Sequence, residues 1–270
     1  MSMRLDAAIA ARGLARSRTH AAQLIEAGLV CVGGRPVVKP SAKVADTDPI
    51  EVAASDHYVS RAAHKLIAGL DAFGVSVDGR VTLDMGASTG GFTQVLRERG
   101  ADPVIAVDVG HGQLAPSIGA DARVISVEGY NVRHMTAGSL AEASGVAMRP
   151  EVITGDLSFI SLAHVLPAVA AVAAVTSDIV LLIKPQFEVG RGGVREGLVT
   201  DAAARADATA SVLWSAWDAG LGTHGVIASP IVGTHGNREF VTHLRPRSGA
   251  DDHGNPTEWL GTVNRLAGEG

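Results

Sequence analysis

The chain has 270 residues, of which 46% are hydrophobic and 4% aromatic, and this length suits a small domain joined to a larger one with aliphatic cores. Its single cysteine, Cys31, excludes an internal disulfide and a cysteine-based zinc site; together with histidines that lack metal-ligand spacing, it leads us to expect a cytoplasmic protein without bound metal. The net charge is −5, but residues 1–40 hold six Lys and Arg against two acidic residues, which favours contact with nucleic acid over the alternative of a solvated basic surface.

The first segment of the chain predicts a small α+β domain. Apolar residues at helical spacing indicate a helix over residues 5–9 and a second one over 21–28. Residues 29–32 have the pattern of a strand and end at a Gly-Gly turn. Further short strands are expected at 37–38 and 50–52.

Strand-like and helix-like runs alternate in the rest of the chain. We expect strands at residues 81–85, 103–109, 123–127, 151–154, 178–183, 223–229 and 239–244. We expect helices at residues 91–99, 113–118, 161–175 and 202–219. This alternation predicts a mostly parallel, Rossmann-like seven-stranded sheet with helices on both faces. The last strand follows the sixth without a helix, so it should be antiparallel.

Composition also suggests domain boundaries. We expect an N-terminal domain over residues 1–56, a linker over 57–60, a larger α/β domain over 61–247 and a polar C-terminal tail with one short helix over 248–270. The apolar stretch 162–183 contains a proline and an aspartate, so it fits a buried helix and strand better than a membrane span. We therefore expect no membrane contact.

A glycine-rich turn after the first strand of the larger domain indicates a cofactor site. Its GxxxGG spacing differs from the nicotinamide fingerprint, and Phe92 stands where a phosphate-binding loop has lysine. S-adenosylmethionine fits better, because it needs room for a sulfonium and an amino-acid tail and little phosphate recognition. Asp108 ends the next strand, where a carboxylate can accept hydrogen bonds from ribose hydroxyls. The alternative is a tight turn without a ligand. The expected cofactor contacts are Asp84, Gly86, Ala87, Ser88, Thr89, Gly90, Gly91, Phe92, Asp108 and Asp156.

Lys184 is an unusual residue at its position. It directly follows the apolar run 178–183, so it should lie at the edge of the core, partly desolvated and beside Asp156. The alternative is an ordinary solvated lysine. We expect Glu188, a few residues later, to be a surface or loop residue.

Four segments, GASTGGF, GDLSFISL, LLIKPQFEVG and RGLARSR, resemble the TlyA family of ribosomal-RNA 2′-O-methyltransferases. The larger domain is similar to FtsJ-like methyltransferases. The N-terminal domain resembles the alpha-L RNA-binding domain of a small-subunit ribosomal protein and of pseudouridine synthases. The resemblance covers about residues 1–247 and departs from the family at the linker His57-Tyr58-Val59-Ser60, where we would expect Arg and Trp.

The resemblance implies the chemistry and its residues. The expected reaction transfers a methyl group from S-adenosylmethionine to a cytidine ribose in rRNA or ribosomal subunits, with the subunit left open. The implied catalytic tetrad is Lys65, Asp156, Lys184 and Glu239. The implied RNA-contacting residues are Arg4, Arg16, Arg18 and Lys39.

Elementary chemistry is consistent with these roles. A ribose hydroxyl is a poor nucleophile that needs a base, and two neighbouring lysines disfavour each other's charge, so one can be neutral. We assign the base to Lys184 and its orientation to Asp156, while Lys65 and Glu239 would shape the field. Arginines near the start of the second helix oppose its dipole, a penalty that a bound phosphate would reverse.

Three other functions are alternatives to this one. An amino-methyltransferase would carry [DN]PP[FY] after the fourth strand, whereas residues 156–159 here read Asp-Leu-Ser-Phe. A non-catalytic RNA-binding assembly factor would not need an intact tetrad. The haemolysin label found in this family predicts membrane lysis, for which the sequence offers no spanning or cationic amphipathic helix. We expect a monomer.

Overall fold

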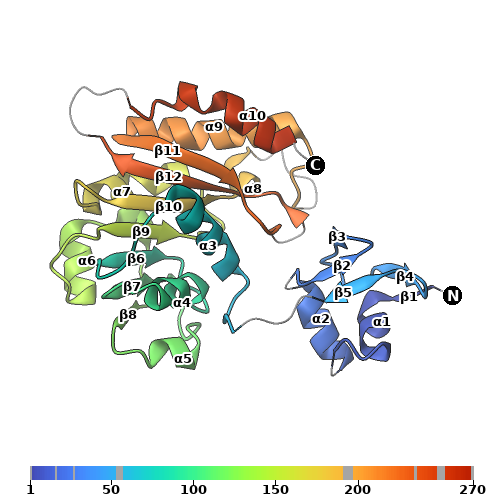
Figure 1. Cartoon of the computed structure of the whole chain (residues 1–270). Helices are drawn as coiled ribbons and strands as arrows, with labels where there is room; N and C mark the ends of the chain where they lie inside the picture. The colour runs from blue at the N-terminus through green and yellow to red at the C-terminus, as the bar shows by residue number, and fades with distance from the viewer. Residues whose placement is uncertain are drawn as a thin grey trace.

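A computed structural model of the chain gives the architecture in Figure 1, with a small N-terminal body beside a larger one. The described residues are 2–15, 17–26, 28–52, 57–190, 197–233, 236–247 and 253–268.

The small body packs short helices against short strands. Its elements are β1 (Ser2–Arg4), α1 (Leu5–Ala11), α2 (Arg18–Glu26), β2 (Val30–Val32), β3 (Arg35–Pro36), β4 (Lys43–Ala45) and β5 (Ile50–Val52). β1 pairs with β4, and β2 lies between β3 and β5. Leu5, Ile9 and Ile25 have no exposed surface and form the centre of its core.

The hairpin in this body begins its second strand two residues earlier than we predicted. We expected a strand at 37–38, whereas Arg35 pairs with Val32 directly across the turn. Gly33 and Gly34 both have positive φ, at 58° and 74°, as a two-residue type I′ turn requires. Because that turn fixes the register, β3 starts immediately after it.

The larger body is built on a seven-stranded sheet in the order β11-β12-β10-β9-β6-β7-β8. Its strands are β6 (Thr82–Met85), β7 (Val104–Val107), β8 (Val124–Val127), β9 (Val152–Gly155), β10 (Asp178–Ile183), β11 (Leu221–Ala228) and β12 (Phe240–Pro246). All seven predicted strands are confirmed, and β12 is antiparallel to both its neighbours, as expected. The predicted fold class is therefore confirmed.

Helices cover both faces of the sheet (Figure 1). They are α3 (Ala62–Phe73), α4 (Gly91–Glu98), α5 (Pro116–Gly119), α6 (Ala137–Ser144), α7 (Leu166–Val172), α8 (Pro185–Glu188), α9 (Ala202–Asp218) and α10 (Leu260–Gly268), with short 3-10 turns η1 (Val132–His134), η2 (Leu162–His164) and η4 (Pro256–Glu258). Leu66 and Leu96 of α3 and α4 pack on one face, and Leu166 and Leu213 of α7 and α9 pack on the other. We did not predict α6 or α8, which are short.

The expected polar tail is instead part of the larger body. α10 packs along α9, and its Val263 and Ala267 are buried in the main core. Arg205 of α9 reaches across and donates to the Ala267 carbonyl at 2.7 Å. None of the helices in the described ranges combines the length and apolar character that a membrane crossing requires.

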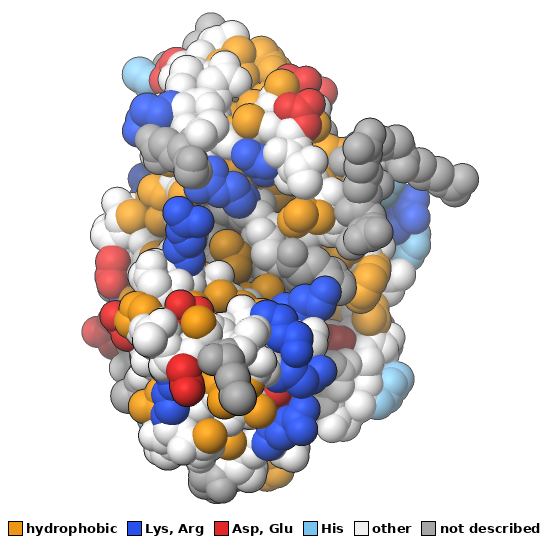
Figure 2. Space-filling model, turned by 90° about the vertical axis from the view of Figure 1, so that its right-hand side faces the viewer, with side chains coloured by type: hydrophobic (Ala, Val, Ile, Leu, Met, Phe, Trp, Pro, Cys, Tyr) orange, Lys and Arg blue, Asp and Glu red, His pale blue; other side chains and the backbone are white. Residues whose placement is uncertain are grey.

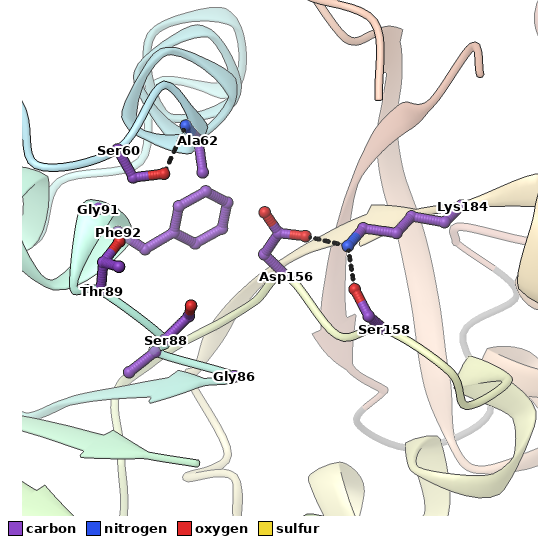
Figure 3. Close-up of a pocket in the computed structure, with 11 residues that line it drawn as sticks. Ser60, Ala62, Gly86, Ser88, Thr89, Gly91, Phe92, Asp156, Ser158 and Lys184 are labelled. Atoms are coloured by element: carbon purple, nitrogen blue, oxygen red, sulfur yellow. Dashed lines mark hydrogen bonds and ion pairs between the residues drawn. The ribbon is translucent and has the colours of Figure 1, made fainter. Parts of the chain in front are cut away.

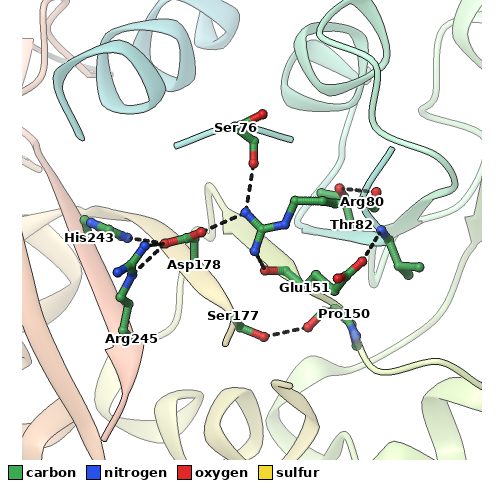
Figure 4. A network of polar contacts seen from close by, with 10 residues as sticks. Ser76, Arg80, Thr82, Pro150, Glu151, Ser177, Asp178, His243 and Arg245 are labelled. Carbon is green, nitrogen blue, oxygen red and sulfur yellow. Dashed lines mark hydrogen bonds and ion pairs between the residues drawn. The ribbon is translucent and has the colours of Figure 1, made fainter. Parts of the chain in front are cut away.

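A buried carboxylate ties β12 to β10 at the edge of the sheet where β10 begins (Figure 4). Asp178 lies 2.9 Å from the His243 ring nitrogen and accepts hydrogen bonds from Arg80 at 2.7 Å and Arg245 at 2.8 Å. Burial alone would raise the pKa of Asp178, but the hydrogen bonds from His243, Arg80 and Arg245 hold it far below the usual range. The cluster favours one register, in which Ile179 faces Leu244 and Ile183 faces Phe240.

Replacing this carboxylate should destabilise the larger body. We expect Asp178→Asn to lower the free energy of unfolding by about 3–5 kcal/mol, because Arg80 and Arg245 lose a buried counter-charge. Urea denaturation at pH 7 measures the loss. Because the pKa of Asp178 is lowered in the native state, its contribution to stability is present above the ordinary pKa of an aspartate and is lost as pH falls. The difference in free energy of unfolding between wild type and Asp178→Asn should therefore shrink below about pH 4.

Asp71→Asn is the matched control for this measurement. Asp71 pairs with Arg99 on the surface, with 60% of its side chain exposed, so its loss should cost at most about 1 kcal/mol. Equal stability of the Asp178 and Asp71 variants would contradict the structural role of the cluster.

Candidate active site

The glycine-rich turn between β6 and α4 packs tightly against its surroundings. Gly86 has φ 77°, and a Cβ there would lie 3.1 Å from the Asp156 carbonyl oxygen. A Cβ on Gly91 would lie 2.7 Å from the Cβ of Ser60. Side chains at either position would therefore push the turn away from the neighbouring loops and close the space beside it.

Two adjoining cavities open at this turn. One measures about 550 Å³ and the other about 160 Å³. Both are lined by Gly86, Ser88, Asp156 and Ser158, which lie at their junction. The larger cavity is also lined by Val107, Asp108, Val109, Gln113, Tyr130, Asn131, Val132, Leu157, Phe159 and Ile160. The smaller is also lined by Ser60, Ala62, Ala87, Thr89, Gly91, Phe92 and Lys184 (Figure 3).

Asp108 lies at the wall of the larger cavity, directly after β7. Its carboxylate accepts hydrogen bonds from the backbone N–H groups of Ser88 at 2.9 Å and Gly110 at 2.7 Å. These bonds fix the carboxylate at the carboxyl edge of the sheet, where α/β folds bind ligands.

Most of the predicted cofactor contacts line one of the cavities. The lining residues among them are Gly86, Ala87, Ser88, Thr89, Gly91, Phe92, Asp108 and Asp156. Gly90 is instead the N-cap of α4, with φ 96°. Several further lining residues were missed, including Tyr130 and Asn131, which follow the end of β8, where strand-end position was the available signal.

The prediction for Asp84 differs from the structure. Asp84 is fully buried beneath the turn and lines neither cavity in the part of the chain that is described. It accepts hydrogen bonds from Thr93 at 2.6 Å and Thr154 at 3.2 Å. Its side chain thus ties β6 to α4 and β9, and burial raises its pKa to about 6.

Four charged side chains from distant parts of the sequence meet beside the smaller cavity. Lys65 comes from α3, Asp156 follows β9, Lys184 follows β10 and Glu239 precedes β12. Lys65, Lys184 and Glu239 are at most 9% exposed. The structure therefore brings together all four residues of the predicted tetrad.

The four side chains form a row of alternating charge. Glu239 Oε2 lies 2.6 Å from Lys65 Nζ, which is 4.0 Å from Asp156 Oδ2. Asp156 Oδ1 lies 2.5 Å from Lys184 Nζ. With both lysines protonated, the row holds two cations and two anions. This balance of charge offsets the free-energy cost of burying each group in a site of low dielectric.

Two neutral side chains extend the row at its ends. Lys184 Nζ donates a hydrogen bond to Ser158 Oγ at 2.8 Å, and Gln186 Nε2 donates to Glu239 Oε1 at 3.3 Å. The sequence reasoning missed both residues as site residues, although each lies two positions from a tetrad residue.

Glu188 is not the surface residue that we expected. It is half-buried at the end of α8 and accepts hydrogen bonds from Ser161 Oγ at 2.6 Å and Leu162 N at 2.9 Å. Burial raises the pKa of Glu188. The contact cross-links the segment that carries Asp156 to the segment that carries Lys184.

The predicted RNA contacts lie on the small body, where Lys and Arg side chains gather on one side (Figure 2). Arg4 and Arg18 approach Asp6 at 2.8 and 3.2 Å, and the hydrogen bond from Arg4 is the main reason why the pKa of Asp6 falls to about 2. Lys39 is exposed. Arg16 lies outside the described residues. Asp6 thus holds Arg4 and Arg18 side by side.

The atypical linker is held against α4. His57 lies 2.8 Å from Glu98, and the Val59 N–H donates to Gln94 Oε1 at 2.9 Å. Ser60 then reaches Gly91 at the start of the same helix. The segment that leaves the small body is therefore packed on the helix that follows the glycine-rich turn.

Asp84 makes the stability of the larger body depend on pH. Because its native pKa is raised to about 6, its favourable contribution is complete below its ordinary pKa and is lost as pH rises through 6. Between about pH 4 and pH 7, the free energy of unfolding of wild type should therefore fall by up to about 3 kcal/mol. Asp84→Asn has no such carboxyl group and should not show this fall. Urea unfolding of both proteins across that range measures it.

An exposed substitution on α9, Asp218→Asn, controls for the loss of one negative charge. Parallel pH–stability curves for wild type and Asp84→Asn would show that the carboxyl group is charged in the fold.

Comparisons with known proteins identify both parts of the chain. The FtsJ-like methyltransferase family matches residues 58–246, and the S4 domain family matches residues 3–50. The chain is 47% identical to the 16S/23S rRNA (cytidine-2′-O)-methyltransferase TlyA of Mycobacterium tuberculosis, over 91% of this chain and 90% of that protein. It is 38% identical to Hemolysin A of Brachyspira hyodysenteriae, over 90% of this chain and 99% of that protein.

A solved structure of a hemolysin-named protein from Streptococcus thermophilus superimposes with a TM-score of 0.75 at 36% identity. The superposition covers 98% of this chain and 95% of the Streptococcus thermophilus protein. The S4 match precedes the FtsJ-like match, and the similarity to these relatives extends over nearly the full length of the chain. The chain belongs to the TlyA family, in which an S4 domain is joined to an FtsJ-like methyltransferase domain.

Proposed function

We propose that this protein transfers a methyl group from S-adenosylmethionine to the ribose 2′-hydroxyl of a cytidine in ribosomal RNA. The observation that carries the proposal is the row Glu239–Lys65–Asp156–Lys184 beside the smaller cavity, with Asp156 at the junction of the two cavities. The named activity of the Mycobacterium tuberculosis relative supports the choice of cytidine and rRNA.

The cavities fit S-adenosylmethionine. The larger one has room for an adenosine, with Asp108 at its wall to receive ribose hydroxyls. Because Gly86 and Gly91 carry no side chains, the smaller cavity stays open for the amino-acid part. When bound, the cofactor supplies an electrophilic methyl group. The residues that we expect to hold it are Gly86, Ala87, Ser88, Thr89, Gly91, Phe92, Asp108 and Asp156.

The row of charges supplies what a ribose hydroxyl needs. Lys184 is the base: after its ammonium group has released a proton to solvent, the neutral amine takes the hydroxyl proton, with Asp156 Oδ1 2.5 Å from its Nζ. Lys65, fixed by Glu239, keeps a cation beside the oxygen on which negative charge develops. Because the groups are held before the reaction, little reorganisation is required during it.

The small body would bring the enzyme to folded RNA. Arg4 and Arg18, which both contact Asp6, and the exposed Lys39 offer positive charge to RNA phosphates, and Arg16 extends the same basic segment of the sequence. We expect recognition of RNA shape rather than base stacking on this body. The substrate would be a ribosomal subunit or its RNA, which would place the protein in the cytoplasm. We expect it to act as a monomer.

The decisive experiment is transfer of a labelled methyl group from S-adenosylmethionine to unmodified 30S and 50S subunits. Nuclease digestion and mass spectrometry then identify the modified nucleoside. A 2′-O-methylcytidine supports the proposal, and mapping assigns the subunit. A base-methylated cytidine would instead establish the amino-methyltransferase alternative, and cofactor binding without any product would favour an assembly factor.

The base is tested by Lys184→Ala, which should lower kcat by about 10²-fold or more, in the range of general-base catalysis. Binding of S-adenosylmethionine, measured by calorimetry, should change less than about threefold, because most of the proposed cofactor contacts are untouched. Lys184→Arg is the matched control, since it keeps the charge but cannot act as a neutral base. Substantial activity in Lys184→Arg would contradict the assignment.

The RNA surface is tested by Arg18→Ala and Lys39→Ala. Each should weaken subunit binding and reduce the slope of log K against log salt by about 1, because one phosphate contact is lost. Filter binding at several salt concentrations measures both effects. Arg123→Ala, which removes an exposed arginine paired with Asp102 on the larger body, is the control and should leave the slope unchanged; an equal effect there would mean that only net charge matters.

A further inference from the structure

Ser158 lies at the meeting point of the site. It follows Asp156 by two residues, lines both cavities and is exposed to them. Figure 3 shows its hydroxyl and the Asp156 carboxylate directed at the same atom, Lys184 Nζ, from two sides. The distances are 2.8 Å from Ser158 Oγ and 2.5 Å from Asp156 Oδ1.

The two contacts at Lys184 Nζ determine where the lone pair of its neutral amine can point. A neutral lysine nitrogen has four tetrahedral directions. One is the bond to Cε, two are N–H bonds and the fourth is the lone pair. Ser158 Oγ accepts one N–H bond, and the Asp156 carboxylate, in ion-pair contact at 2.5 Å, attracts the other, so the direction left to the lone pair is restricted. With only one acceptor, the amine can rotate about its Cε–Nζ bond, and the lone pair samples other directions.

We propose that Ser158 is a positioning residue that, together with Asp156, aims the Lys184 lone pair at the target hydroxyl. This inference rests on the proposed function, in which Lys184 is the base. In the step concerned, the O–H bond of the ribose hydroxyl breaks and a third N–H bond forms on Lys184 Nζ. The oxygen keeps the electron pair that makes it a nucleophile, and Asp156 stabilises the resulting ammonium group.

The backbone near Ser158 is held independently of its hydroxyl. Glu188 binds Ser161 Oγ and the Leu162 N–H, three and four residues further on. The Asp156 N–H donates to the Met85 carbonyl at 3.1 Å on the other side. Removal of one oxygen atom at Ser158 should therefore leave the segment in place, so that a kinetic effect reports on Lys184.

The test compares Ser158→Ala with Ser158→Thr, using ribosomal subunits and the full chain. We expect Ser158→Ala to lower kcat by about 10- to 100-fold, because an ill-directed base loses part of the general-base advantage. KM for the subunit and Kd for S-adenosylmethionine should change less than about threefold. Ser158→Thr keeps the hydroxyl and should recover most of the lost kcat.

Ser215→Ala is the matched control, since the Ser215 hydroxyl bonds only within α9, to the Ser211 carbonyl, among the contacts described; it should keep wild-type kcat. Wild-type kcat in Ser158→Ala, a rise in KM alone, or a Thr variant as slow as the Ala variant would each overturn the inference. A wild-type enzyme that forms no 2′-O-methylcytidine would instead refute the proposed function itself, so the two failures are distinguishable.

Discussion

β12 runs antiparallel between β10 and β11, and the rest of the site depends on this pairing. The pairing sets Phe240 opposite Ile183, so that Glu239 and Lys184 stand at the same edge of the sheet although 55 positions separate their numbers in the chain. Glu239 then meets Lys65 from α3, which precedes it by 174 positions in the sequence. Without that strand in that register, two lysines would lie near the core with a single carboxylate between them, and burial of the second cation would be costly.

The same pair of strands carries ionic clusters at both ends. At one end, Asp178 gathers Arg80, His243 and Arg245; at the other, Lys184 and Glu239 belong to the row of the site. Slippage by one residue would break both clusters and turn buried side chains toward the wrong face. Charge pairing therefore specifies the register, while the apolar side chains between the clusters supply the burial that stabilises it.

The carboxylates of the chain have different tasks that follow from their surroundings. Asp84 sits below the glycine-rich turn between two threonines, and burial raises its pKa to about 6. Asp6 lies under two arginines of the small body, which lower its pKa to about 2 and hold those arginines together. Asp108 and Asp156 face the cavities, where their oxygen atoms can meet a ligand. Environment, rather than residue type, separates structural carboxylates from those available for chemistry.

The sequence alone determined the seven strands of the larger sheet, their alternation with helices, and the presence of the cofactor turn. Near-continuous apolar runs such as residues 178–183 identify strands buried on both faces, and a glycine turn between strand and helix is a local feature. Strand-end position was also enough to select Lys184 and Asp156, because parallel strands place their carboxyl ends at one edge of the sheet.

Only the tertiary structure decided which side chains touch. Asp84 is adjacent to the cofactor turn in sequence, but the alternation of the strand directs it into the core. Ser158 and Glu188 belong to motifs that the sequence displays, yet their partners lie 26 and 27 positions away. Three-residue strands such as β1 and β4, and the packing of α10 on α9, depend on partners distant in sequence. Pattern is set by neighbours along the chain, whereas hydrogen-bond partners, burial and pKa are set by neighbours in space.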